Sequence, residues 1–214
     1  MPAPSSPMPQ YLRRYTDLPA LLYMLKEKKI TLLDPASWDD SNDSHYLSRY
    51  KEKKALSSVL AICFSQADET YHHWRVFSGS SSGVCIRFKR EPLLRALRKR
   101  AGVMLGEVNY MTLAQARKQA PSIAGLPFIK RAAFVDEQEF RAIFESGDQT
   151  MRSLDITLPL SCIERISLSP WLHKNLADAT KEAIKAIDGC AGLKVYRSTL
   201  IGNEEWKTIG GSAC

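Results

Sequence analysis

The sequence has 214 residues, of which 44% are hydrophobic and 25% are charged, a composition typical of a globular chain with one substantial core. Its apolar runs are all shorter than a transmembrane helix requires, so we expect no membrane span. Lys and Arg number 30 against 23 Asp and Glu, a formal net charge of +7, which favours anionic partners such as nucleic acid or phosphorylated cofactors.

The cysteines indicate a reducing compartment. Cys63, Cys85, Cys162, Cys190 and Cys214 are odd in number and include no Cys-x-x-Cys pair. Three lie in apolar, strand-like runs, so we expect reduced, mostly buried thiols in a cytoplasmic protein. The N-terminus is rich in Pro and Ser and lacks the basic and apolar regions of a signal peptide. We predict a disordered tail over residues 1–10, a single domain over residues 11–206 and a flexible C-terminus over residues 207–214.

An amphipathic helix is predicted after a short extended segment at residues 11–15. Asp17 is placed to cap this helix, Pro19 lies in its first turn, and apolar residues recur at the i, i+3, i+4 and i+7 positions of one helix face. The next predicted segments are a strand at 30–33, a turn-rich segment at 34–43, a helix at about 45–54, a buried strand at 58–65 and a helix at 71–77.

Strands and helices continue to alternate in the second half. We predict a strand at 84–88, a basic helix at 90–100, a strand at 103–110, a helix at 112–119 and a loop at 121–127. Strands at 154–160 and 163–168, a helix at 175–187 and a strand at 193–196 complete the chain. Successive strands with helices grouped between them predict an α+β domain.

Residues 128–145 have the pattern most suggestive of a site. As a strand, this stretch places Glu137, Glu139 and Arg141 on one side and residues 138, 140, 142 and 144 on the other. Neighbouring carboxylates repel, which raises the pKa of one of them, and a nearby arginine lowers it again. Such a group suits a general base or the stabilisation of a positive transition state. The alternative is a solvated strand edge with an ordinary ion pair.

Familiar phosphate-binding and nucleophile signatures are absent from the sequence. The Gly79–Gly83 segment could hold a phosphate, although a flexible turn is the simpler interpretation. His72 and His73 are adjacent, so on a helix they point about 100° apart and cannot share a metal. Five carboxylates could bind a hard cation, although aspartates in such a segment are more often turn formers and caps: Asp39, Asp40, Asp43, Glu137 and Glu139.

Several short motifs occur in a fixed order along the chain. They are Arg14-Tyr15, Leu33 to Asp40 with Asp43, Cys63-Phe-Ser65, Trp74 with Phe77, Gly83 to Phe88, Val108-Asn-Tyr110, Lys130 to Phe134, and Glu137-Gln-Glu-Phe-Arg141. This order resembles a family of bacterial domains of unknown function found near defence and mobile loci, over about residues 11–200. The sequence departs from that family at Asp39, Asp43 and Phe134, where the family usually has Asn, Glu and Trp.

Arg14, Ser65 and the Glu137-x-Glu139 pair are also similar in order to the Arg/Ser/Glu class of ADP-ribosyltransferases. That resemblance implies antiparallel or mixed strands in a split sheet with flanking helices, and NAD as co-substrate without a metal. It implies that Glu139 stabilises the ribose cation as nicotinamide leaves, and that Glu137 takes a proton from the acceptor.

Five further residues are assigned to NAD by the same resemblance. Arg14, beside Tyr15, would bind the pyrophosphate, and Ser65 would orient Glu139. Tyr71 or Trp74 would stack on nicotinamide. For Trp74, core packing at helical spacing is the alternative.

We therefore predict an NAD-dependent ADP-ribosyltransferase, a bacterial toxin or antiphage defence effector, with an inhibitor or antitoxin protein as a partner. Arg95, Arg98 and Lys99 share one face of the basic helix, so the predicted acceptor is a nucleic acid, RNA or single-stranded DNA. Two alternatives remain. One is a metal-dependent nuclease that uses the five carboxylates, and the other is a non-catalytic nucleic-acid-binding module that uses the basic helix.

Overall fold

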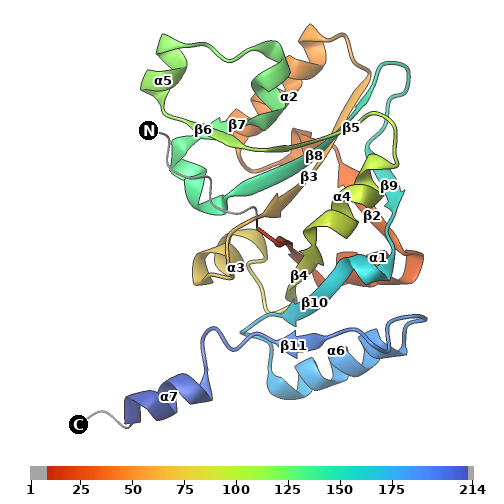
Figure 1. Ribbon diagram of the computed structural model, residues 1–214, viewed down its shortest axis with the longest axis vertical. Coiled ribbons are helices and arrows are strands. Elements are labelled where there is room, and N and C mark those ends of the chain that lie inside the picture. The colour runs from red at the N-terminus through yellow and green to blue at the C-terminus, as the bar shows by residue number, and fades with distance from the viewer. Residues whose placement is uncertain (1–8, 212–214) are drawn as a thin grey trace.

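The strands and helices of the computed structural model, which describes residues 9–211, are arranged as Figure 1 shows. The strands are β1 (Tyr11–Asp17), β2 (Lys29–Leu33), β3 (Ser58–Ser65), β4 (Gly83–Lys89), β5 (Val103–Glu107), β6 (Asn109–Met111), β7 (Ile129–Arg131), β8 (Glu139–Ser146), β9 (Ser153–Thr157), β10 (Ile163–Leu168) and β11 (Val195–Arg197). The helices are α1 (Leu18–Glu27), α2 (Ser41–Lys53), α3 (Tyr71–Phe77), α4 (Arg90–Arg98), α5 (Leu113–Lys118), α6 (Lys174–Ala186) and α7 (Glu204–Gly211). Short 3-10 helices are η1 (Pro35–Ser37), η2 (Ile123–Phe128), η3 (Ala132–Glu137) and η4 (Leu160–Cys162).

The main sheet splits between β1 and β3. Its order is β11-β10-β4-β1-β3-β2-β9, and β8 lies on β3 with β5 beyond it. Strand β1 pairs with β4 along its whole length, whereas it meets β3 only where Arg13 lies opposite Ser65. The strands diverge beyond that point and leave a gap in the sheet. Most neighbours are antiparallel and β10–β11 are parallel, so the predicted α+β class with a mixed, split sheet is confirmed.

The two faces of β3 and β8 pack against different helices because successive side chains alternate across a sheet. One face contributes Leu60, Ile62, Phe64, Phe140, Ala142 and Phe144 to a core shared with α1 and α4. The other face contributes Val59, Ala61 and Ile143 to a smaller core with Leu47 and Tyr50 of α2. Ser65, Glu139 and Arg141 therefore belong to the α2 face by the same alternation.

Local capping explains the first two helices. The carboxylate of Asp17 accepts a hydrogen bond of 2.8 Å from the backbone N–H of Ala20, as the sequence predicts. Helix α2 begins at Ser41, four residues earlier than predicted, because Asp40 caps it by accepting from the N–H of Asn42 at 3.0 Å. The aspartate-rich segment thus supplies a helix start.

The predicted strands at 103–110 and 128–145 are both interrupted. The first divides at Val108 into β5, which pairs with β8, and β6, which pairs with β7 in a separate two-stranded sheet. The second divides into β7, η3 and β8, because Gln138 adopts a left-handed conformation with φ of 43°. Glu137 therefore ends η3, and only Glu139 and Arg141 of the predicted polar face lie on a strand.

The C-terminal elements lie at one end of the molecule, where α6 covers β11 and α7 projects away from the sheet (Figure 1). Helix α7 crosses the predicted domain boundary at residue 206. Most of the predicted N-terminal tail, residues 1–8, lies outside the described residues, as do residues 212–214 with Cys214. Cys85, Cys162 and Cys190 are buried and Cys63 is half-buried. Between residues 9 and 211, no helix has the length and apolar character needed to cross a membrane.

Candidate active site

A cavity of about 420 Å³ opens where β1 and β3 diverge. Its walls come from β1, the ends of β3 and β8, α2, α3, β7, η3 and the segment between η1 and α2. They include Arg13, Arg14, Tyr15, Trp38, Asp39, Asp40, Asp43, Cys63, Ser65, Val76, Phe77, Lys130, Phe134, Glu137 and Glu139. Residues from six of the sequence motifs therefore meet in one place.

Glu139 is the first residue of β8 and lies opposite Ser65. Its carboxylate lines the cavity although the residue is only 5% exposed. It accepts a hydrogen bond of 2.9 Å from Nη2 of Arg141 and a second bond from Nε of the same guanidinium. Burial acts to raise the pKa of Glu139, but the charge and hydrogen bonds of Arg141 outweigh it, so the pKa is lowered. Glu139 therefore lines the cavity as a carboxylate whose ionised form is favoured by its contacts with Arg141.

Arg141 is fully buried and joins two parts of the chain that are far apart in sequence. Its Nη1 donates to Oδ1 of Asp43 at 2.8 Å and to the carbonyl oxygen of Pro127 at 3.0 Å. Its Nη2 also bonds Asp43. Asp43 and Glu139 thus share one guanidinium, which fixes α2 against the start of β8.

Glu137 lies next to Glu139 but has a different cation. Lys130 Nζ is 2.6 Å from Oε2 of Glu137 and 3.3 Å from Oε2 of Glu139. Burial raises the pKa of Glu137, and the bond to Lys130 offsets this only in part. The two neighbouring carboxylates therefore have pKa values displaced in opposite directions, an arrangement that suits a base beside a carboxylate that stays ionised more readily.

Ser65 does not bond the Glu139 carboxylate, which corrects the role predicted from the sequence. Its hydroxyl donates to the backbone carbonyl of Glu137 at 2.8 Å and accepts from the N–H of Ala67. His73 makes a similar contact that the sequence did not suggest, since Nε2 lies 2.9 Å from the carbonyl oxygen of Asp136. A carbonyl can only accept, so His73 carries its proton on Nε2. Together they hold the turn that positions Glu137.

Arg14 brings positive charge to the cavity wall without a carboxylate partner among residues 9–211. Its Nη1 donates to the carbonyl oxygen of Cys63 at 3.2 Å. Burial lowers the pKa of Arg14, although it remains far above neutrality for a guanidinium. Arg13, by contrast, is bonded to the carbonyl of Ala67 and to Asp68. Arg14 is therefore the better candidate to meet an anion.

Tyr71 and Trp74 do not line the cavity, so the predicted stacking of either residue on a ligand is wrong. Trp74 is fully buried, and its indole N–H donates to Oε1 of Glu69 at 2.8 Å. Tyr71 is exposed and packs against Trp171 on the outer surface. The helix instead presents Val76 and Phe77 to the cavity, next to Tyr15.

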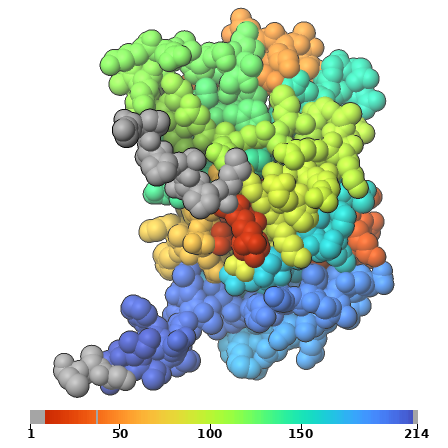
Figure 2. Space-filling model, in the orientation of Figure 1, coloured from red at the N-terminus to blue at the C-terminus, as the bar shows by residue number. Residues whose placement is uncertain are grey.

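The basic helix lies on the opposite face of the sheet from these carboxylates. Helix α4 buries Leu93, Leu94 and Leu97 in the core on the α1 face. Its exposed cations include Arg95, Arg98 and Lys99. The segment that contains α4 forms part of the surface that Figure 2 shows in yellow-green. These cations do not adjoin the cavity, so one ligand would have to pass around the sheet to touch both.

The five carboxylates considered for a metal are engaged in other contacts or separated. Within residues 9–211, no group of three or more His, Cys, Asp or Glu side chains is arranged to hold a metal ion. Arg141 occupies both oxygens of Asp43, Lys130 bonds Glu137 and Glu139, and Asp40 caps α2. This arrangement does not favour the nuclease interpretation.

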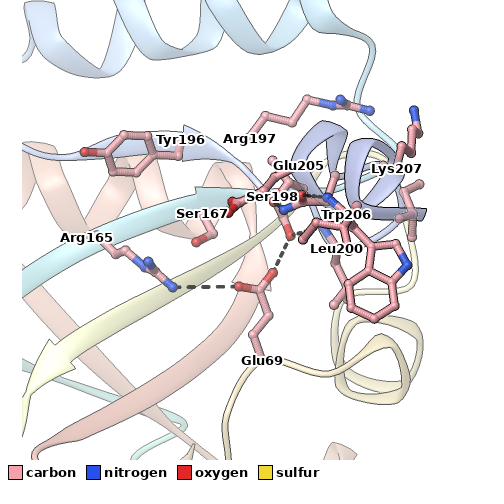
Figure 3. Close-up of a pocket in the computed structure, with 15 residues that line it drawn as sticks. Glu69, Arg165, Ser167, Tyr196, Arg197, Ser198, Leu200, Glu205, Trp206 and Lys207 are labelled. Carbon is pink, nitrogen blue, oxygen red and sulfur yellow. Dashed lines mark hydrogen bonds and ion pairs between the residues drawn. The ribbon is translucent and has the colours of Figure 1, made fainter. Parts of the chain in front are cut away.

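A larger cavity, of about 970 Å³, lies beside β10, β11 and α7 (Figure 3). At its centre, Glu69 is bonded to Ser198 and lies 3.9 Å from Arg165. The same carboxylate also accepts from Trp74, so its bonding capacity is largely used inside the protein. The ionisable groups converge in the smaller cavity, which we therefore take as the candidate active site.

No protein-family model matches the chain, and no curated protein matches it. Among solved structures, it is similar to Thermus sp. 2.9 DarT in complex with carba-NAD+, with 10% identity, a TM-score of 0.46, and 90% of this chain and 97% of that chain covered. It is also similar to Thermus sp. 2.9 DarT in complex with ADP-ribosylated ssDNA, with 11% identity, a TM-score of 0.48, and 91% and 97% covered. What the cavity can do must be derived from its own residues.

Proposed function

We propose that the chain is an NAD-dependent ADP-ribosyltransferase and that the cavity between β1 and β3 binds NAD. The observation that carries this proposal is a buried carboxylate, Glu139, which is bonded by Arg141 and lines the same cavity as Arg14, a guanidinium without a carboxylate bonded to it among the described residues. The cavity thus offers one group for a developing cation and one for a phosphate anion.

The cavity fits the chemistry of NAD in charge and in the nature of its walls. Its volume of about 420 Å³ is within the range of small-molecule sites. Arg14 can meet the pyrophosphate with two parallel N–H donors. Tyr15, Phe77 and Trp38 give the planar surfaces on which a nicotinamide or adenine ring can lie.

NAD supplies the ADP-ribosyl group. The bond between ribose C1′ and the nicotinamide nitrogen breaks, and its electron pair leaves with nicotinamide. Positive charge therefore develops on the ribose. The Glu139 carboxylate stabilises that charge and can accept a hydrogen bond from a ribose hydroxyl. Arg141 keeps Glu139 ionised and fixed, so no reorganisation is needed. Glu137 takes the proton that the acceptor loses when it bonds to C1′.

The acceptor is proposed to be a nucleic acid, RNA or single-stranded DNA. The net charge of +7 favours a polyanion. A second cavity of about 290 Å³ shares Lys130 with the candidate active site and is lined by exposed Arg131 of β7 and by part of α5, the helix that carries exposed Arg117 and Lys118. These cations, rather than those of α4, belong to elements that border a cavity next to the site. The resemblance to domains found near defence loci supports a role as a toxin or antiphage effector held in check by an inhibitor protein.

The proposal is tested by incubating the protein with NAD labelled in the adenylate phosphate and a single-stranded oligonucleotide. We expect label on the oligonucleotide that nuclease releases and protease does not. Label that protease releases would move the acceptor to protein while leaving the transferase in place. A protein that binds the oligonucleotide and neither binds nor consumes NAD would instead be the non-catalytic binding module.

A further inference from the structure

Lys130 lies at the partition between two cavities. The candidate active site and a neighbouring cavity of about 290 Å³ share Asp40, Asp43 and Lys130 as wall residues. The lysine side chain is only 9% exposed, and its ammonium lies 4.8 Å from the ring centre of Phe134. A lysine is seldom buried without a partner, so its contacts indicate what it does.

The ammonium of Lys130 faces three carboxylates. Nζ is 2.6 Å from Glu137, 3.3 Å from Glu139 and 3.7 Å from Asp43. Arg141 already bonds Glu139 and Asp43 through its guanidinium. For Glu137, Lys130 is the cation bonded to it among the residues that the structure describes.

The surroundings of Glu137 would favour its protonation without that cation. From β8, Glu139 and Arg141 act on Glu137 with opposite charges. From α2, Asp43 lies 3.7 Å from the ammonium of Lys130. Tyr110 of β6 lies against the same carboxylates, with its hydroxyl 2.8 Å from the N–H of Glu139. Burial and the like charge of Glu139 both oppose ionisation of Glu137, and the ion pair with Lys130 is the largest of the contacts that favour it, ahead of the charge of Arg141.

We propose that Lys130 is a positioning residue for the transfer reaction, which holds Glu137 ionised and fixed beside Glu139 so that Glu137 can accept the proton of the acceptor. This inference rests on the proposed function. It assigns the two cations of the site different tasks. Arg141 serves the carboxylate at the ribose, and Lys130 serves the base.

The activity test compares Lys130→Met, which keeps the length and removes the charge, with Lys130→Arg, which keeps the charge. In Lys130→Met, transfer at neutral pH should fall about 10²-fold, and the acid limb of the pH–rate profile should move to higher pH. Lys130→Arg should restore the position of that limb and part of the rate. Lys185→Met, on the exposed surface of α6, is the control and should match the wild type.

An unchanged acid limb in a folded Lys130→Met protein would overturn the inference, and so would Lys130→Arg behaving like Lys130→Met in both rate and pH profile. If the wild type consumes no NAD at any pH, the proposed function fails, and a second measurement still tests the electrostatic role of Lys130.

That measurement is the pH dependence of the melting temperature. Loss of Lys130 removes a positive charge beside Glu137 and Glu139. This loss destabilises the fold only at pH values at which those carboxylates are ionised. The destabilisation by Lys130→Met, relative to wild type, should therefore be large near neutral pH and shrink as falling pH protonates Glu137. A destabilisation that is the same at every pH would mean that Lys130 contributes packing alone and would contradict the inference.

Discussion

Arg141 joins carboxylates from distant parts of the chain, since Asp43 and Glu139 lie on α2 and β8. The alternation of side chains along a strand was enough to predict that Glu139 and Arg141 share a face. The contact with Asp43 spans 98 residues and has no local signal. The contact of His73 could not be predicted from local sequence either, because the partner of its imidazole is a backbone carbonyl 63 residues away.

Replacing Arg141 should destabilise the protein far more than replacing an exposed arginine. In Arg141→Met, two buried carboxylates lose their shared cation, and breaking a buried pair in this way typically costs about 3–5 kcal/mol. Arg49→Met is the matched control, because its pair with Glu52 is exposed on α2 and such pairs contribute about 0.2–1 kcal/mol. Urea denaturation measures both. Similar losses would show that the buried network adds no stability.

Replacing Glu137 should separate transfer from hydrolysis. If Glu137 activates only the acceptor, Glu137→Gln should reduce ADP-ribosyl transfer much more than NAD hydrolysis, in which water is the acceptor. Burial raises the pKa of Glu137, so wild-type transfer should fall with acid at a higher pH than an ordinary glutamate would give. Both rates are measured on the same protein across pH. Equal losses would mean that the two carboxylates act as a unit.

At the scale of elements, strands and helices with strong periodicity were predictable, and the junctions between them were not. The apolar run of β3 and the cap of α1 follow from local sequence. The turn before β8 does not, because the left-handed Gln138 is stabilised by contacts from β3 and α3 that hold the preceding carbonyls. Helical spacing also predicted that Trp74 lies on an apolar helix face. Spacing alone does not distinguish a face that packs in the core from a face that lines a ligand site.

Ser65→Ala should test whether this turn positions Glu137. Loss of the hydrogen bond to the Glu137 carbonyl should lower the free energy of unfolding by about 1 kcal/mol. The rate of transfer should also fall, even at a temperature where the wild type and the variant are both fully folded. Ser44→Ala removes an exposed bond within α2 and is the control. Transfer equal to wild type in folded Ser65→Ala would rule out a positioning role for Ser65.

For the whole molecule, the side of the sheet on which a group of exposed cations lies decides whether those cations can contact a nucleic acid bound at the candidate active site. Helix α4 lies on the face away from Glu139, whereas β7 lines the candidate active site through Lys130 and α5 lines the neighbouring cavity. Sequence periodicity predicted the shared face of Arg95, Arg98 and Lys99 and could not predict on which side of the sheet that face lies. Only the packing of Leu93, Leu94 and Leu97 determines it.

The salt dependence of oligonucleotide binding should distinguish the two basic surfaces. Each phosphate neutralised on a single strand contributes about −0.7 to the log–log slope of affinity against salt. The triple variant Arg117→Gln, Lys118→Gln, Arg131→Gln should flatten that slope. The matched triple variant Arg95→Gln, Arg98→Gln, Lys99→Gln should leave it unchanged. The reverse result would place the nucleic acid on the α4 face.

The release of nicotinamide from NAD tests the central claim most directly. We expect release by the wild type, and a decrease of about 10²- to 10³-fold in Glu139→Gln, because the charge that faces the developing ribose cation is lost. Glu182→Gln, on the exposed surface of α6, is the control and should retain wild-type release, and circular dichroism establishes that both variants are folded. Nicotinamide release at the wild-type rate by a folded Glu139→Gln protein would contradict the account.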